Sequence, residues 1–196
     1  MAEMTTRQKE IVEVAIKLIA EGGIQNLTMS NIARQIGVSE PAIYRHFRSK
    51  MDILLAMLGQ FKQRSEFQLK QARFFDSSGI VLLETIFLEH AGQFAAHPHM
   101  AAVVFAEEAF RSEPRLAEET FVIMTLAYDT VAGIIERAQA RREIRSDIPK
   151  DHLALMILGS LRLLVKRWCM SKYAFELQPE SVRVWESLKT LLSVKK

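Results

Sequence analysis

The stretch LTMSNIARQIGVSEPAIYRHFRSKMDIL, residues 27–54, decides how the first part of this chain folds. Thr28 stands where a residue whose hydroxyl caps a helix is expected. The apolar residues behind it recur at helical spacing, and Gly37 follows where a left-handed residue commonly ends a helix. The apolar residues of this first short helix are Ile32, Ala33 and Ile36.

A second short helix follows directly, and Ser39 is expected to cap it. Pro41 is tolerated there because amides in the first turn of a helix have no intrahelical acceptor to lose. Ile43 and Phe47 lie four residues apart and should point inward together. Two short helices joined at Gly37 make a helix-turn-helix over about residues 28–47, and its second helix suits the major groove of DNA.

The second helix carries more polar side chains than a short surface helix needs. Arg45 can donate to a guanine edge or a phosphate, Tyr44 and His46 can hydrogen-bond phosphates, and Pro41 and Ala42 can pack on thymine methyl groups. The structural alternative is a hydrogen-bonded pair of Tyr44 and His46 that closes the small core. We expect DNA contact.

The flanking sequence is helical on both sides. Apolar residues at helical spacing predict a helix from Thr5 to about Glu21, ended by glycines. The string SKMD, residues 49–52, fits a capping pattern and predicts a helix that runs to about residue 74, roughly 35 to 40 Å long. The free amides at the starts of the helices capped by Thr28 and Ser49, with Lys50 beside the latter, are suited to phosphate oxygens.

Beyond residue 79 every segment again has helical periodicity. We expect helices over about 80–94, 100–110, 114–140, 151–172 and 179–194. In the helix from 114, apolar residues step alternately by four and three, and a second face is apolar too, which suits a helix that meets both its own core and a partner.

Composition excludes several classes of protein. The chain has 196 residues, 49% of them hydrophobic and 25% charged, which is typical of a soluble globular protein. It lacks an apolar run long enough for a membrane span and the pattern of a signal peptide, so we expect a cytoplasmic protein with no membrane partner. The net charge of +3 lies within residues 1–72, and residues 73–196 are balanced.

At residues 27–54 the sequence resembles the TetR family of bacterial transcriptional regulators, and a helix ending in EGG, residues 21–23, precedes the motif at the usual distance. The resemblance implies an all-α fold of about nine helices, with three N-terminal helices joined by a long helix to a helical ligand-binding and dimerisation domain. We expect a DNA-binding domain over residues 1–50 and the second domain over 51–196. The resemblance also implies a homodimer formed through the helices at about 114–140 and 151–172.

Family positions carried over residue by residue divide the DNA contacts into two groups. Phosphate contacts fall on Thr28, Tyr44, His46 and Lys50. Base-reading positions fall on Glu40, Pro41, Ala42 and Arg45, and Ser39 at the helix start is counted with the DNA-binding residues. Glu40 stands where many relatives carry a neutral or basic residue, so it either accepts from a cytosine amino group or points away from the bases.

Several large apolar side chains beyond residue 80 are candidates for lining a ligand cavity, and ordinary core packing is the alternative for each of them. Their character favours a hydrophobic effector such as a fatty acyl chain or a lipophilic drug. The residues assigned to this candidate site are Phe87, Phe94, Met100, Phe105, Met124 and Tyr128.

We expect no metal, no cofactor and no enzymatic activity. His90, Glu89, His97, His99 and Glu107 are close in sequence, but their spacing fits no familiar ligand motif. No catalytic motif of the common hydrolase, phosphate-binding or zinc-protease type is present.

The sequence therefore predicts a homodimeric transcriptional regulator that binds a near-palindromic operator. We expect a repressor that a small, hydrophobic ligand releases from DNA. The alternative keeps the DNA binding but replaces the small molecule with a protein partner.

Overall fold

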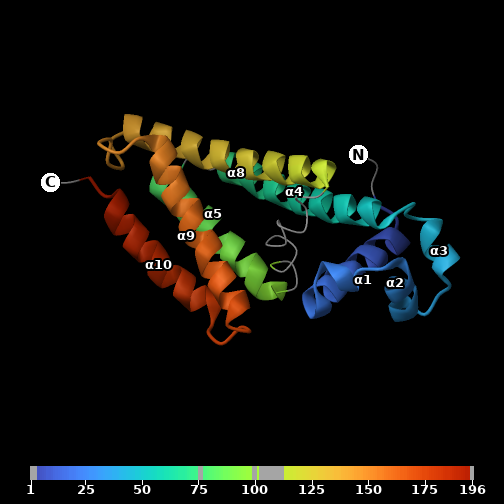
Figure 1. The fold of residues 1–196 in the computed structure, drawn as a ribbon. Coiled ribbons are helices and arrows are strands. Elements are labelled where there is room, and N and C mark those ends of the chain that lie inside the picture. Colours follow the sequence, from blue (N-terminus) through green and yellow to red (C-terminus); the bar gives the residue numbers. More distant parts are fainter. Residues whose placement is uncertain (1–3, 75–76, 99–100, 102–112, 195–196) are drawn as a thin grey trace. The chain divides into compact units, whose positions relative to one another are not determined.

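The computed structural model of the chain describes residues 4–74, 77–98, 101 and 113–194, and these residues form helices and no strands. The predicted all-α fold is thereby confirmed. The predicted helix over 100–110 lies outside the described residues, apart from Ala101. The elements are α1 (Thr6–Gly22), the short 3-10 helix η1 (Ile24–Asn26), α2 (Met29–Ile36), α3 (Glu40–Tyr44), α4 (Lys50–Phe74), α5 (Gly79–Ala96), α8 (Pro114–Ala140), α9 (Lys150–Met170) and α10 (Leu177–Leu192) (Figure 1).

The chain divides into two compact units. The first comprises residues 1–63 and 99–121, and the second comprises 64–98 and 122–196. Both α4 and α8 therefore contribute residues to each unit. None of the helices in the described part of the chain combines the length and the apolar character needed to cross a membrane.

The first unit is built on α1, which starts with a reciprocal cap. Thr5 Oγ1 accepts from the Gln8 amide at 3.2 Å, and Gln8 Oε1 accepts from the Thr5 amide at 3.0 Å, so two amides at the helix start are satisfied. One face of α1 is buried and packs with α2 and η1. Its buried residues are Ile11, Val12, Ala15, Leu18 and Ile19.

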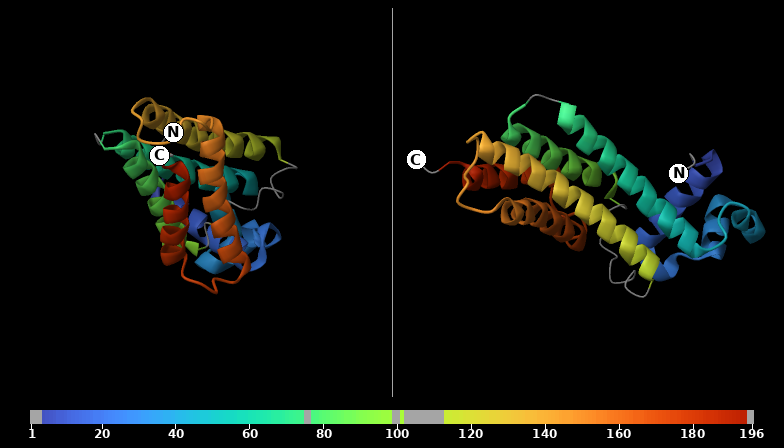
Figure 2. Two further views of the ribbon diagram at one scale, coloured as in Figure 1. Left: turned by 90° about the vertical axis from the view of Figure 1, so that its left-hand side faces the viewer. Right: turned by 90° about the horizontal axis from the view of Figure 1, so that it is seen from above.

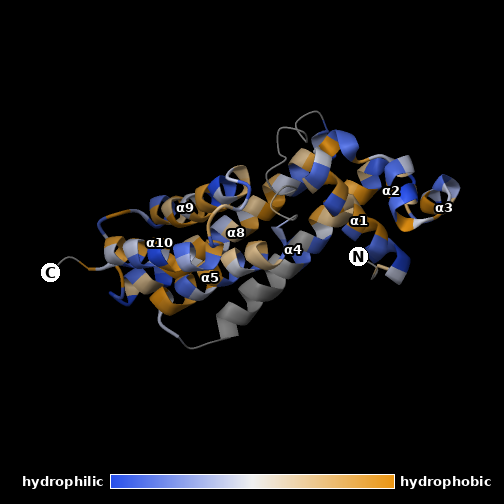
Figure 3. Cartoon of the chain, turned by 90° about the horizontal axis from the view of Figure 1, so that it is seen from below, coloured by the Kyte–Doolittle hydropathy of each residue, from blue (hydrophilic) through white to orange (hydrophobic). Residues whose placement is uncertain are grey.

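The second unit is organised around the antiparallel pair of α5 and α10. The rings of Phe87 and Trp185 are centred 5.5 Å apart. Towards one end of the pair, Glu84 Oε2 lies 4.0 Å from Lys189 Nζ. Towards the other end, Gly92 lies close to Gln178, since a Cβ atom added at Gly92 would be 3.2 Å from Gln178 Nε2. Helix α9 packs on both helices (Figures 1 and 2), and hydrophobic residues recur along all three (Figure 3).

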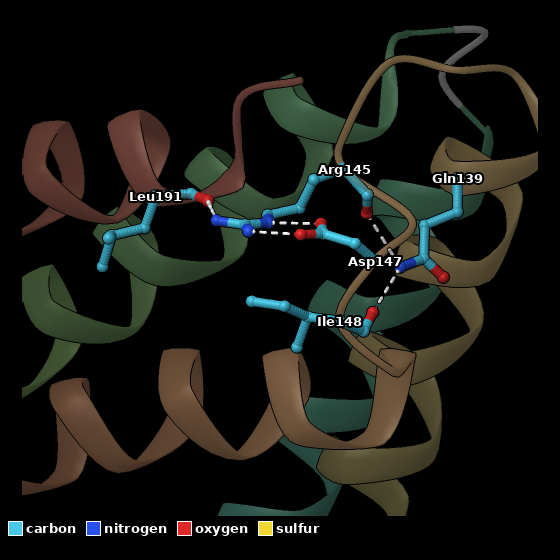
Figure 4. Close-up of polar contacts among 5 residues, drawn as sticks. All are labelled: Gln139, Arg145, Asp147, Ile148 and Leu191. Carbon is cyan, nitrogen blue, oxygen red and sulfur yellow. Dashed lines mark hydrogen bonds and ion pairs between the residues drawn. The ribbon is translucent and has the colours of Figure 1, made fainter. Parts of the chain in front are cut away.

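The loop between α8 and α9 is fastened to the end of α10 by a polar network (Figure 4). Arg145 pairs with both carboxylate oxygens of Asp147 at 2.6 and 2.7 Å and donates to the Leu191 carbonyl at 3.2 Å. Gln139 Nε2 donates to the carbonyls of Arg145 and Ile148, each at 2.9 Å. The network fixes a loop that has no regular structure of its own.

Replacing Gln139 with Ala should lower the free energy of unfolding by about 1 to 3 kcal/mol, because two partly buried carbonyls lose their shared donor. Urea denaturation is the measurement. Gln35→Ala is the control, since Gln35 is an exposed helical glutamine on α2. Equal urea midpoints for the two variants would mean that the hydrogen bonds of the Gln139 amide do not stabilise the loop.

Candidate nucleic-acid interface

The turn between α2 and α3 has the predicted caps. Thr28 Oγ1 accepts from the Asn31 amide at 3.0 Å at the start of α2. Gly37 has a φ of +80° at its end, and the amides of Gly37 and Val38 both donate to the Ala33 carbonyl. An L side chain at position 37 would be strained in this left-handed conformation. The abrupt turn therefore depends on glycine.

Helix α3 differs from the expected helix in two respects. It ends at Tyr44 instead of continuing to Phe47, and the chain proceeds through a turn at residues 45–46. Ser39 occupies the cap position, but its hydroxyl makes no capping hydrogen bond. A cap side chain normally accepts from the second or third helical residue. Here the second is Pro41, which has no N–H, and the amide of the third, Ala42, donates to the Ser39 carbonyl at 2.9 Å.

Two buried side chains hold α3 and the following turn in place. Ile43 and Phe47 are 1% and 6% exposed, as their spacing predicted. Gln8 Nε2 adds a hydrogen bond of 3.4 Å from α1 to the His46 carbonyl. The segment that carries the candidate DNA contacts is thus anchored from both sides.

The polar side chains of this segment point outward. Tyr44 is 47% exposed, and Arg45, His46 and Arg48 are exposed as well. The structural alternative, in which Tyr44 and His46 close the small core, is wrong because both side chains lie at the surface. Within the described residues neither Arg45 nor Arg48 forms a salt bridge. Their charges are available for phosphates.

The remaining candidate DNA contacts on this surface differ in exposure. Thr28, Ser39 and Pro41 are exposed, whereas Glu40 and Ala42 are partly buried. Glu40 is the first residue of α3, where a carboxylate is favoured by the positive end of the helix dipole. This position gives Glu40 a structural role independent of base recognition.

Lys50 has a structural contact that its sequence position did not reveal. Its ammonium group donates to the Ile24 carbonyl at 3.0 Å, which ties the start of α4 to η1. Nearby, Ser49 Oγ accepts from the Asp52 amide, and an Asp52 oxygen accepts from the Arg48 amide. The predicted cap of the long helix is confirmed. Because an ammonium group has three hydrogens, Lys50 keeps donors for a phosphate.

The candidate ligand-lining residues do not all share one environment. Phe87 and Phe94 are buried on α5. Met124 is 48% exposed on α8, so within this chain it lies at the surface instead of lining an interior. The Tyr128 hydroxyl forms a hydrogen bond with Asp151 and so lies at the start of α9. Burial and this hydrogen bond raise the pKa of Tyr128. Met100 and Phe105 lie outside the described residues.

Possible metal ligands do not gather in the described part of the chain, where no group of three or more His, Cys, Asp or Glu residues could hold an ion. Of the residues considered from sequence, His99 and Glu107 lie outside that part.

Two family models together match almost the whole chain. Residues 11–57 match the model of bacterial regulatory proteins of the tetR family, and residues 47–190 match that of the C-terminal region of YsiA-like proteins. The chain belongs to the TetR family. It is therefore a DNA-binding transcriptional regulator, and α2 and α3 are its helix-turn-helix.

Individual TetR-family proteins resemble the chain over nearly its full length. The fatty acid metabolism regulator protein of Bacillus subtilis (strain 168) is 27% identical over 192 residues, which cover 96% of each chain. The crystal structure of the transcriptional regulator FadR from Bacillus subtilis in complex with stearoyl-CoA has a TM-score of 0.76 and 26% identity, covering 93% of this chain and 97% of that one. The ketosteroid regulator KstR2 of Mycobacterium tuberculosis has a TM-score of 0.84 at 17% identity, covering 99% and 98%, and shares the fold.

One supporting contact of this TetR-family interface was missed from sequence. Gln8 of α1, far from α3 in the sequence, donates a hydrogen bond to the His46 carbonyl in the turn after α3. Its only sequence signal is the T-x-x-Q pattern of Thr5 and Gln8, which predicts a helix start and says nothing about a partner in another helix.

Proposed function

We propose that this TetR-family regulator is a homodimeric repressor that a long-chain acyl-CoA releases from its operator. The class of effector is inferred from the nearly full-length similarity, at 26–27% identity, to a fatty acid metabolism regulator and to a FadR structure with stearoyl-CoA. The ketosteroid regulator is similar in fold but only 17% identical. Sequence similarity, more than fold, therefore favours an acyl thioester.

The proposed homodimer uses the exposed face of α9. Leu155, Leu163 and Met170 are 59%, 61% and 75% exposed on this helix, and Met156 is 49% exposed. Gly159 lies among them, and a Cβ placed there would contact nothing within 4 Å. Such a row of exposed apolar residues is unfavourable in water and is suited to an identical helix of a second copy. Met124 of α8 is a further apolar residue with an exposed side chain.

In the proposed complex, two copies of α3 enter successive major grooves on one side of the duplex, with half-sites roughly 34 to 36 Å apart. Arg45 and Arg48 supply positive charge, and Tyr44 and His46 donate to phosphates. Thr28 and Lys50 hold phosphates beside the groove, while Pro41, Ala42 and Arg45 face the bases. An effector that binds one conformation more tightly than the other would change the separation of the two copies of α3 through α4.

Fluorescence anisotropy on the intergenic DNA upstream of the regulator's own gene tests this proposal, with scrambled DNA as the reference. We expect tight, sequence-selective binding that stearoyl-CoA abolishes at micromolar concentration. Selective binding that is unaffected by acyl-CoA would contradict the effector and would favour regulation through a protein partner. Weak binding to both DNAs with a steep salt dependence would contradict the choice of operator.

Replacing Tyr44 with Ala should weaken binding to operator and scrambled DNA by the same factor, because a phosphate contact carries no base information. Arg48→Ala should likewise weaken binding to both DNAs and should reduce the magnitude of the slope of log K against log salt by about 1, because Arg48 supplies positive charge to a phosphate. A substitution of Ala42, which faces the bases in the proposed complex, is the contrasting change and is expected to alter which sequence is preferred. Unchanged affinity for Tyr44→Ala at fixed salt would contradict the proposed docking.

A further inference from the structure

Two buried polar side-chain atoms in the described part of the chain have no hydrogen-bond partner, namely Trp185 Nε1 and Thr120 Oγ1. A threonine hydroxyl rotates and can reach a carbonyl of its own helix one turn earlier. An indole N–H is fixed in the plane of its ring and has no such local acceptor. Trp185 is therefore the residue whose unpaired donor requires an explanation.

Trp185 lies in the interior of the second unit. It is 0% exposed on α10, and its ring packs against Phe87 of α5, with centroids 5.5 Å apart. Leu188 and Ser181, about one turn away on either side, are buried as well, and the Ser181 hydroxyl donates to the Leu177 carbonyl of its own helix. The Ser181 hydroxyl is thus engaged within its own helix, and the Trp185 N–H has no acceptor among the described residues.

The second tryptophan of the chain provides an internal comparison. Trp168 is almost as deeply buried, but its Nε1 donates to the Phe175 carbonyl at 2.9 Å. A buried donor without an acceptor destabilises a fold, and native structures contain few of them. A phenylalanine would fill much of the same space without this penalty. The indole at position 185 is thus costly for the chain alone and becomes favourable when a bound molecule supplies an acceptor.

We propose that the Trp185 N–H donates to the thioester carbonyl of a bound long-chain acyl-CoA. This inference rests on the proposed effector. The phosphates of the CoA group are too strongly hydrated to enter an apolar interior, and the alkyl tail has no acceptor. Of the uncharged acceptors of acyl-CoA, the thioester carbonyl lies nearest the tail, nearer than the two amide carbonyls of the pantetheine arm. Phe87 packs on the Trp185 ring, so α5 and α10 together place the donor at an apolar site.

The test compares two ligands on three proteins by calorimetric titration. The ligands are stearoyl-CoA and octadecyl-CoA, the thioether that lacks the carbonyl oxygen. The proteins are the natural chain, Trp185→Phe and Trp168→Phe. We expect the natural chain and Trp168→Phe to bind the thioester about tenfold more tightly than the thioether, which is the effect of one neutral hydrogen bond. Trp185→Phe should bind both ligands equally, because the lost ring volume affects the two ligands alike and the thioester alone loses a hydrogen bond.

A second measurement does not depend on the stability of the Trp185 variant. In Trp168→Phe the only remaining indole is Trp185, so stearoyl-CoA should shift its fluorescence emission and octadecyl-CoA should do so less. If the natural chain binds stearoyl-CoA but shows no preference over the thioether, the inference is overturned and the proposed effector stands. If the natural chain binds neither ligand, both are overturned.

Discussion

A glutamate in place of Leu163 should convert the proposed dimer into monomers and reduce operator affinity at least 100-fold. Leu163 is 61% exposed at the centre of the apolar face of α9. In a two-fold interface each substitution occurs twice, so two like charges would be desolvated close together. A monomer contacts a single half-site and loses the gain in effective concentration that links two half-sites.

The matched control is Leu191→Glu, because Leu191 is a leucine of similar exposure, 57%, on α10. It should remain dimeric and bind operator normally. Light scattering after size-exclusion chromatography measures the mass, and anisotropy measures the affinity. If Leu191→Glu dissociated the dimer and Leu163→Glu did not, the interface would lie on α10 and the proposed use of α9 would be wrong.

Acidification from pH 7 to pH 5 should cost the protein about 2 kcal/mol of stability through His90 alone. Burial lowers the pKa of His90 to about 4 from its ordinary value of 6.5, and its ring lies edge-on to Phe94. Between these pH values the unfolded chain binds a proton that the folded chain does not. The free energy of unfolding therefore falls as pH decreases from about 6.5 to about 4, and this loss is absent above pH 7.

Urea denaturation of His90→Gln at pH 5, 6 and 7 checks this prediction. Between pH 7 and pH 5 the free energy of unfolding of the variant should fall by about 2 kcal/mol less than that of the natural chain, whatever the stability of the variant at pH 7. His97→Gln, which removes an exposed histidine just after α5, should keep the natural slope. Parallel pH profiles for His90→Gln and the natural chain would show that the His90 imidazole titrates normally in the folded state.

Local chemistry made much of the fold and the DNA-binding surface predictable. Thr28 caps α2, Gly37 adopts the left-handed conformation, and Ile43 and Phe47 are buried because helical spacing placed them on one face. These features depend on neighbours within a few residues, so the pattern of residues 27–54 contained them. The cap expected of Ser39 is an exception, because Pro41 has no N–H and the Ala42 amide donates to the Ser39 carbonyl instead of the hydroxyl.

Other features were decided by contacts between residues far apart in the chain. The amide of Gln8 reaches the turn after α3, Lys50 donates to Ile24, and Trp185 is buried against Phe87 with its N–H unpaired.

The sequence by itself determined where most helices lie, the caps of Thr28 and Ser49, and the polar surface of the reading helix, because each follows from the order of nearby residues. Beyond residue 79, only the tertiary structure decided which apolar residues became core and which stayed exposed. Periodicity gives each helix an apolar face but does not say what covers it. It therefore could not reveal that Met124 and Leu163 lie at the surface while Phe87 and Trp185 are enclosed.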